Sequence, residues 1–148
     1  MKTPDYYIDF AKEMFYRNKL EEMQIWGGEP FLAMHRAYHT IEEVINYFPN
    51  FKQLMVSTNM VSEQFFEEFW GLIELFGKYP DRKFEFRLQL SCDGPTNIND
   101  SNRGEGVTAK IIDVFHKMVD EMPNHIPDNL TIRAHMKPTL DSSSIAEL

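Results

Sequence analysis

Two turns of this chain combine glycine with an acidic residue, and both could hold a small ligand. The first turn, Gly27-Gly28-Glu29-Pro30, follows the short apolar stretch 23–26, and the second, Asp93-Gly94-Pro95, follows the stretch 84–91. Paired glycines expose bare backbone that a ligand can approach closely, and carboxylates accept hydrogen bonds from amines and hydroxyls. Each turn therefore predicts a ligand site, although an ordinary tight turn uses the same residue types.

Three further groups of polar residues are candidates for ligand contact. Ser57-Thr58-Asn59 closes another apolar stretch, and Arg103 ends the polar run 99–103. Arg133, His135 and Lys137 alternate near the end of the chain, where they would face either a cavity or a solvated sheet edge. A guanidinium can hold a carboxylate with two parallel hydrogen bonds. A solvated surface arginine is the competing interpretation of Arg103.

Neither a metal site nor a catalytic residue is expected in this chain. His35 and His39 have the i, i+4 spacing of two metal ligands on one helix face, but no third ligand accompanies them. The single cysteine, Cys92, has no base close to it in the sequence. Such a cysteine is usually a small buried apolar residue.

The elements that must position these residues alternate along the chain. Thr3-Pro4-Asp5 predicts the start of a helix that runs to Asn18. Further helices are predicted from a capping box at 40–43 to Pro49, from a Ser62 cap to Gly77, and over 111–123. Strands are predicted over 23–26, 54–57, 84–91 and 130–136, and the turn at 93–95 is followed by a loop that reaches Gly106.

This alternation predicts an α/β fold of parallel strands joined by right-handed helical crossovers. Apolar and polar residues alternate over 84–91, whereas a sheet covered on both faces would be almost continuously apolar. In a partly open barrel the apolar set would pack outward on helices, and Glu85, Arg87, Gln89 and Ser91 would line the lumen. An edge strand with one solvated face gives the same pattern.

Composition limits the classes of function. The chain has 148 residues, 43% of them hydrophobic, with a formal net charge of -8. This length fits one domain, and the acidic balance argues against nucleic acid as a partner, because phosphate binding needs clustered Lys and Arg. The sequence contains no run approaching the roughly twenty apolar residues of a membrane span. We therefore expect a cytoplasmic protein with no membrane partner.

The same motifs, taken in order, resemble the radical S-adenosylmethionine (radical SAM) enzymes, in particular the SPASM-type branch that modifies peptides and matures sulfatases. They are the glycine-acid-proline turn 27–30, the turn 57–59, and the segments 90–95 and 99–103. The resemblance implies that Gly27, Gly28, Glu29 and Pro30 meet the methionine end of S-adenosylmethionine. It further assigns Ser91 and Asp93 to the ribose and carboxylate, and Arg103 to the carboxylate. It also implies that Asn59 is an additional contact of the cofactor.

The resemblance also implies a partial TIM-like (β/α) barrel of about four βα units, open at both edges, over residues 1–148. Two features depart from the family. The C-x-x-x-C-x-x-C loop that holds its 4Fe-4S cluster is missing, and Met60 stands where the family has glycine. Three thiolates are needed to hold such a cluster with one iron open, so this chain alone is expected to be inactive. The first strand with its cluster loop and the end of the barrel are expected to be absent.

The implied function is therefore that of one portion of an enzyme. With a cluster from the missing segment, the intact enzyme would generate a 5′-deoxyadenosyl radical that abstracts hydrogen, for example from a peptide or protein. One alternative is a degenerate, non-catalytic module that binds S-adenosylmethionine or a partner. Another is one half of a split enzyme, completed by a complementary chain that carries the cluster loop and joins the edge of the first strand.

Overall fold

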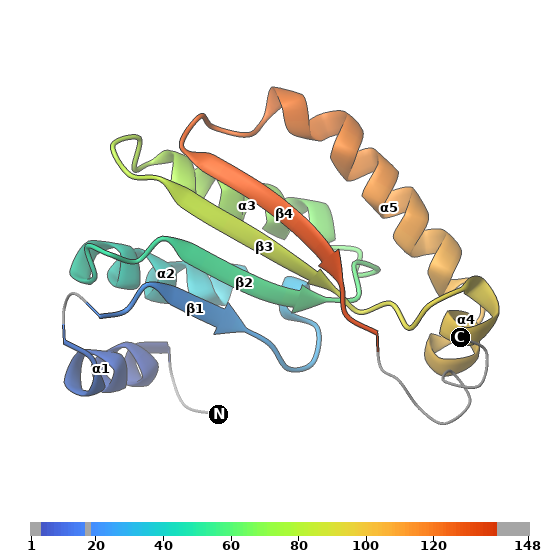
Figure 1. Ribbon diagram of the computed structural model, residues 1–148, viewed down its shortest axis with the longest axis horizontal. Helices are drawn as coiled ribbons and strands as arrows, with labels where there is room; N and C mark the ends of the chain where they lie inside the picture. Colours follow the sequence, from blue (N-terminus) through green and yellow to red (C-terminus); the bar gives the residue numbers. More distant parts are fainter. Residues whose placement is uncertain (1–3, 17–18, 139–148) are drawn as a thin grey trace.

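A computed structural model describes residues 4–16 and 19–138, in which helices and strands alternate (Figure 1). The strands are β1 (Glu22–Ile25), β2 (Gln53–Thr58), β3 (Phe84–Leu90) and β4 (Leu130–Met136). The helices are α1 (Pro4–Met14), α2 (His35–Tyr47), α3 (Phe65–Gly77), α4 (Thr96–Arg103) and α5 (Val107–Glu121), with short 3-10 turns η1 (Pro30–Leu32) and η2 (Met122–Asn124).

The four strands form one parallel sheet in the order β1-β2-β3-β4. The register aligns their carboxyl ends, since Thr58 pairs with Leu90 and Leu90 pairs with Met136. Each connection carries a helix, as parallel neighbours require. The predicted α/β class with parallel βα units is confirmed, and the strand prediction over 130–136 matches β4 residue for residue. The turns after all four strands consequently lie at one edge of the sheet.

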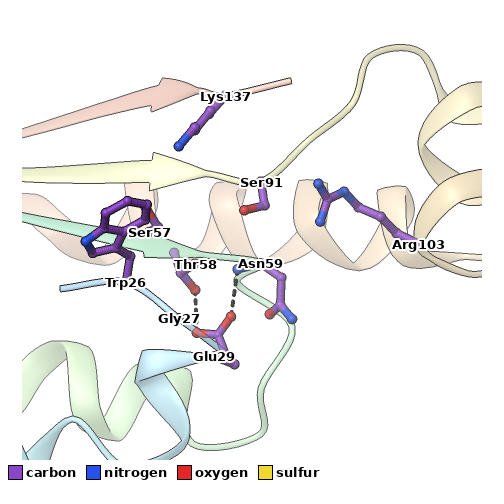
Figure 2. A pocket seen from close by; sticks show the side chains of 10 residues that line it. Trp26, Gly27, Glu29, Ser57, Thr58, Asn59, Ser91, Arg103 and Lys137 are labelled. Carbon is purple, nitrogen blue, oxygen red and sulfur yellow. Dashed lines mark hydrogen bonds between the residues drawn. The ribbon is translucent and has the colours of Figure 1, made fainter. Parts of the chain in front are cut away.

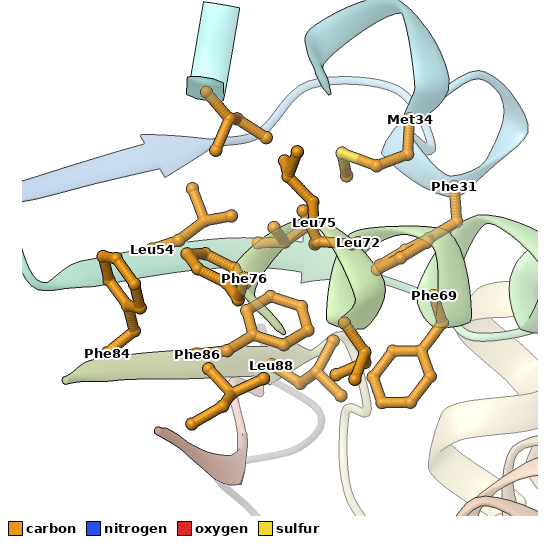
Figure 3. Close-up of a cluster of buried hydrophobic side chains, with 14 of the residues drawn as sticks. Phe31, Met34, Leu54, Phe69, Leu72, Leu75, Phe76, Phe84, Phe86 and Leu88 are labelled. Carbon is orange, nitrogen blue, oxygen red and sulfur yellow. The ribbon is translucent and has the colours of Figure 1, made fainter. Parts of the chain in front are cut away.

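One face of the sheet is packed against helices α2 and α3 and forms the core (Figures 1 and 3). On β3 the residues Phe84, Phe86, Leu88 and Leu90 are buried, and the residues between them are half-buried. Burial of a Phe side chain stabilises a fold by roughly 1.5–3 kcal/mol. The predicted alternation is therefore confirmed for β3, because its apolar residues face the helices. The face covered by the helices is called the outer face below, and the opposite face, which carries the polar set, is called the inner face.

The start of α2 differs from the prediction. The capping box at 40–43 lies inside the helix, which begins at His35. The cap comes instead from α3, because the buried Glu68 carboxylate accepts the His35 backbone N–H at 2.5 Å and contacts the His35 ring. Tyr38 also donates to the Glu68 carbonyl at 2.8 Å. A cap from thirty-three residues away leaves no local signal in the sequence.

The start of α3 also differs from the prediction, because Ser62 does not cap it. The helix begins at Phe65, after Gln64, which makes no side-chain capping bond. The Ser62 hydroxyl donates instead to the Phe31 carbonyl at 3.3 Å. The first helix, α1, begins at Pro4, as predicted, but ends at Met14, before the predicted end at Asn18. Thr3 and Asn18 themselves lie outside the described residues.

The segment expected as a loop between Asp93 and Gly106 contains a helix, α4. Its residues Thr96–Arg103 are polar and have low helix propensity, so periodicity gave no helical signal. Tertiary hydrogen bonds replace apolar packing here. Asn99, fully buried, accepts from the Asp93 backbone N–H at 2.9 Å and donates to Thr108 at 2.8 Å. These bonds attach α4 to the end of β3 and to the start of α5.

None of the helices in the described ranges has the length and apolar character that crossing a lipid bilayer requires.

Candidate functional site

A pocket of about 290 Å3 lies where the carboxyl ends of the strands meet (Figure 2). It is lined by the turn after β1, the ends of β2 and β3, the last residue of α4, and the residue after β4. The lining residues are Trp26, Gly27, Gly28, Glu29, Ser57, Thr58, Asn59, Ser91, Arg103 and Lys137. The pocket is close to the lower end of the range for small-molecule sites. Six of the eight predicted contact residues line it: Gly27, Gly28, Glu29, Asn59, Ser91 and Arg103.

Glu29 ties the glycine turn to the end of β2. Its Oε1 accepts from Thr58 Oγ1 at 2.7 Å, and its Oε2 accepts from the Asn59 N–H at 2.7 Å (Figure 2). Oε1 also accepts from the Phe31 N–H at 3.1 Å. A carboxylate has about four acceptor positions, so one position on Oε2 is left for a ligand. Glu29 thus uses most of its acceptor positions to hold the glycine turn against the end of β2.

The two glycines present bare backbone to the pocket. Gly27 and Gly28 have φ values of 103° and 58°, in the left-handed region that favours glycine. A Cβ added to either residue would meet no atom within 4 Å. The space above them is therefore open, and their conformation explains why this turn needs two glycines.

Met60 takes the backbone shape for which glycine would be the usual choice. Its φ is 60°, and it has the one positive φ among non-glycine residues of the described chain. The side chain is completely buried, and the Met60 N–H donates to Thr58 Oγ1 at 2.9 Å. The Asn59 side chain accepts from the Val61 N–H at 3.0 Å, closing the same turn. Burial and these bonds offset the steric cost of the left-handed conformation.

Asp93 and Arg103 were expected to contact a ligand separately, whereas the structure pairs them. Arg103 Nη2 donates to Asp93 Oδ1 at 2.8 Å, and Arg103 Nε lies 2.8 Å from Oδ2. The Asp93 side chain is 3% exposed and does not line the pocket, while Arg103 does. Asp93 therefore orients Arg103. Pro30 is also outside the lining, because it starts the turn η1.

The predicted contact set did not include Trp26, whose side chain is 72% exposed beside the glycine turn. The sequence pattern places Trp26 at the end of an apolar strand, over 23–26. Lys137 Nζ lies 5.7 Å from the centroid of the Trp26 ring, a cation–π contact between the turn after β1 and the end of β4. A large aromatic residue directly before two glycines was the available signal. Its exposure depends on the open inner face and could not be inferred.

Two other expectations concern residues away from this pocket. Cys92 is buried, and its Sγ lies 3.7 Å from the Gly94 carbonyl, as expected of a small structural residue. His35 contacts Glu68 as described above. Within the described ranges, no three His, Cys, Asp or Glu residues are grouped so that they could hold a metal ion.

Comparisons with protein-family models, with curated proteins and with solved structures found no match to this chain.

Proposed function

We propose that this chain is a portion of a radical SAM enzyme that binds S-adenosylmethionine at the strand-end pocket. The observation that carries the proposal is the convergence of the turns at 27–30 and 57–59 with Ser91 and Arg103 in one pocket. Glu29 joins the first two turns by hydrogen bonds to Thr58 and Asn59. Two turns built from the motif residues thereby line the same pocket, although they are far apart in the chain.

The chemistry of the lining residues fits the charged groups of this cofactor. Its ammonium group would find acceptors in the backbone carbonyls at 27–28 and the remaining position on Glu29 Oε2. Arg103 retains exposed surface and would hold the carboxylate, while Ser91 would hydrogen-bond a ribose hydroxyl. The face of Trp26 already attracts one cation, Lys137, and would equally attract a sulfonium.

The cluster, by contrast, does not fit this chain. The chain has one cysteine, Cys92, which is buried, whereas a 4Fe-4S cluster needs three thiolates. The proposal therefore places the cluster ligands outside these 148 residues. When loaded with both groups, the intact enzyme would supply radical chemistry for hydrogen abstraction, with a peptide or protein as the proposed substrate. The four βα units would be part of a TIM-like barrel whose lumen is the inner face.

Calorimetric titration with S-adenosylmethionine tests the binding step, and two glycines form a matched pair. Gly27 and Gly106 both have left-handed φ, 103° and 76°, and an added Cβ would meet no atom within 4 Å at either, but only Gly27 lines the pocket. We expect one-to-one binding by the wild type. Gly27→Ala should weaken it by about tenfold or more, because the backbone must shift under strain. Gly106→Ala should retain affinity. Absence of binding by the folded wild-type chain would refute the proposal.

A non-catalytic binding module is the second candidate function. It is favoured by the hydrogen bonds that hold the lining residues in place, from Thr58 and Asn59 to Glu29 and from Arg103 to Asp93. Binding of S-adenosylmethionine would be the same in both cases. Expression in frame with the upstream coding sequence distinguishes them, because a C-x-x-x-C-x-x-C segment there would allow a reducible cluster to form.

Completion by a separate chain is a variant of the first proposal. Among the described strands, β1 pairs only with β2, so its other edge offers free backbone hydrogen-bonding groups. A cysteine-rich chain that adds a strand there would supply the cluster loop. Co-purification with such a chain would support this variant, and a cluster bound by this chain alone would contradict it.

A further inference from the structure

A second hollow lies on the inner face of the sheet and shares no residue with the strand-end pocket. It has a volume of about 500 Å3 and is lined by Arg87 of β3 and by Arg133, Ala134 and His135 of β4. Arg87 and Arg133 are direct cross-strand neighbours in the parallel register. Two like charges side by side repel unless something lies between them or binds them.

One carboxylate holds both arginines. Arg87 Nε donates to Glu85 Oε1, and Arg133 Nε donates to Glu85 Oε2 at 3.0 Å. The hydrogen bond from Arg87, with a further contribution from Arg133, keeps the pKa of Glu85 below its ordinary value. Glu85 is thus an anion that orients both guanidinium groups by accepting a hydrogen bond from the Nε of each arginine.

This arrangement leaves the outer nitrogens of both guanidinium groups available. An arginine has five N–H donors, and the bond to Glu85 uses the single one on Nε. In the described part of the chain, no residue accepts a hydrogen bond from the Nη atoms of Arg87 or Arg133. The two side chains are 38% and 65% exposed. Two arginines and one glutamate also give this hollow a local charge of +1, on a chain whose net charge is -8.

We propose that Arg87 and Arg133 form a binding site for an oxyanion, a carboxylate or phosphate group of a ligand that lies against the inner face. Two guanidinium forks present parallel N–H pairs, which match the geometry of such a group. His135 lines the same hollow, and its Nε2 lies 3.3 Å from Gln89 Nε2, which continues the polar row toward the strand ends.

The position of the oxyanion site also bears on substrate choice, and this part of the inference rests on the proposed function. Arg87 of β3 precedes Ser91, the first residue after β3, by four residues, which corresponds to roughly 13 Å along a strand. A substrate anchored by an acidic group at the two arginines could therefore extend to the strand-end pocket. The oxyanion site itself does not depend on the identity of the cofactor.

NMR titration of the full chain tests the site, with the Arg Nε–H signals as reporters. Pyrophosphate and glutarate are added separately at constant ionic strength, so that phosphate and carboxylate are distinguished. We expect saturable shifts of the Arg87 and Arg133 signals with at least one of the probes. Arg87→Gln and Arg133→Gln should each weaken binding by about tenfold, since each removes charged donors. Lys110→Gln, which removes an exposed charge on α5, is the matched control and should leave affinity unchanged.

The outcomes separate this proposal from the cofactor proposal. Equal weakening by Lys110→Gln and Arg133→Gln would mean that only general charge attraction acts, and would overturn the oxyanion site. Absence of saturable shifts with both probes would overturn it as well. A chain that binds a probe but not S-adenosylmethionine would keep the oxyanion site and refute the cofactor proposal. Retained S-adenosylmethionine binding by Arg133→Gln would confirm that the two sites are independent.

Discussion

The two faces of the sheet are built from the same four strands but are held by different forces. The outer face joins Phe69 and Phe76 of α3 to Phe86 of β3, with ring centroids 5.9 and 6.5 Å from Phe86 (Figure 3). The inner face carries ion pairs and hydrogen bonds such as Ser57 to Gln89 at 2.6 Å. Apolar burial dominates stability, whereas polar groups facing solvent add little. The outer face therefore determines the fold, whereas the polar contacts of the inner face contribute little to its stability.

The largest effect should come from emptying the core. Phe86→Ala removes a completely buried ring and should lower the free energy of unfolding by about 3–5 kcal/mol. Gln89→Ala, on the same strand but the inner face, removes the hydrogen bond from Ser57 and should lower it by about 1 kcal/mol. Urea denaturation monitored by circular dichroism measures both. Similar losses for the two variants would contradict the division between the faces.

The second effect concerns the residue that connects the glycine turn to the sheet. Glu29→Gln replaces a carboxylate that accepts from Thr58, Asn59 and Phe31 with an amide that must turn a donor toward at least one of them. An unsatisfied pairing of this kind costs about 1–3 kcal/mol. We expect that loss in urea denaturation, together with weaker S-adenosylmethionine binding by calorimetry. Glu63→Gln, an exposed acid before α3, is the control and should change neither.

The same contrast explains how much could be predicted from the sequence. The alternation of Phe84, Phe86, Leu88 and Leu90 is a local pattern with a large energetic consequence, so it fixed the strand and its buried face correctly. The glycine turn predicted a ligand site because left-handed backbone leaves a local signature. Glu68 at the start of α2 left none, because its partner is distant in sequence. The pairing of Asp93 with Arg103 likewise depends on α4, a helix that periodicity could not reveal.

The third effect is smaller and concerns the hydrogen-bonded support behind Arg103. Asp100 accepts from the Thr108 hydroxyl at 2.6 Å, the Thr108 N–H at 2.8 Å and the Gly106 N–H at 2.8 Å, and these bonds lower the pKa of Asp100. Because the pKa of Asp100 is lower in the folded state, the ionised carboxylate stabilises the fold at pH values above its ordinary pKa of about 3.9. This contribution is lost as the pH falls from that value through the lowered pKa. Asp100→Asn should therefore unfold with a shallower dependence on pH below that value. Identical wild-type and variant profiles in acid denaturation would contradict the assignment.

The smallest effect on stability should come from Arg133, one of the two arginines proposed to bind an oxyanion. Arg133 is 65% exposed, and its ion pair with Glu85 faces solvent, so Arg133→Gln should change the free energy of unfolding by about 0.5 kcal/mol or less. A double-mutant cycle with Glu85→Gln, measured by urea denaturation at low and high salt, isolates the pair. A coupling well above 1 kcal/mol would mean that the pair holds the sheet together. A small coupling, combined with tenfold weaker oxyanion binding, would mean that the inner face is maintained for ligands, because its charges contribute almost nothing to folding.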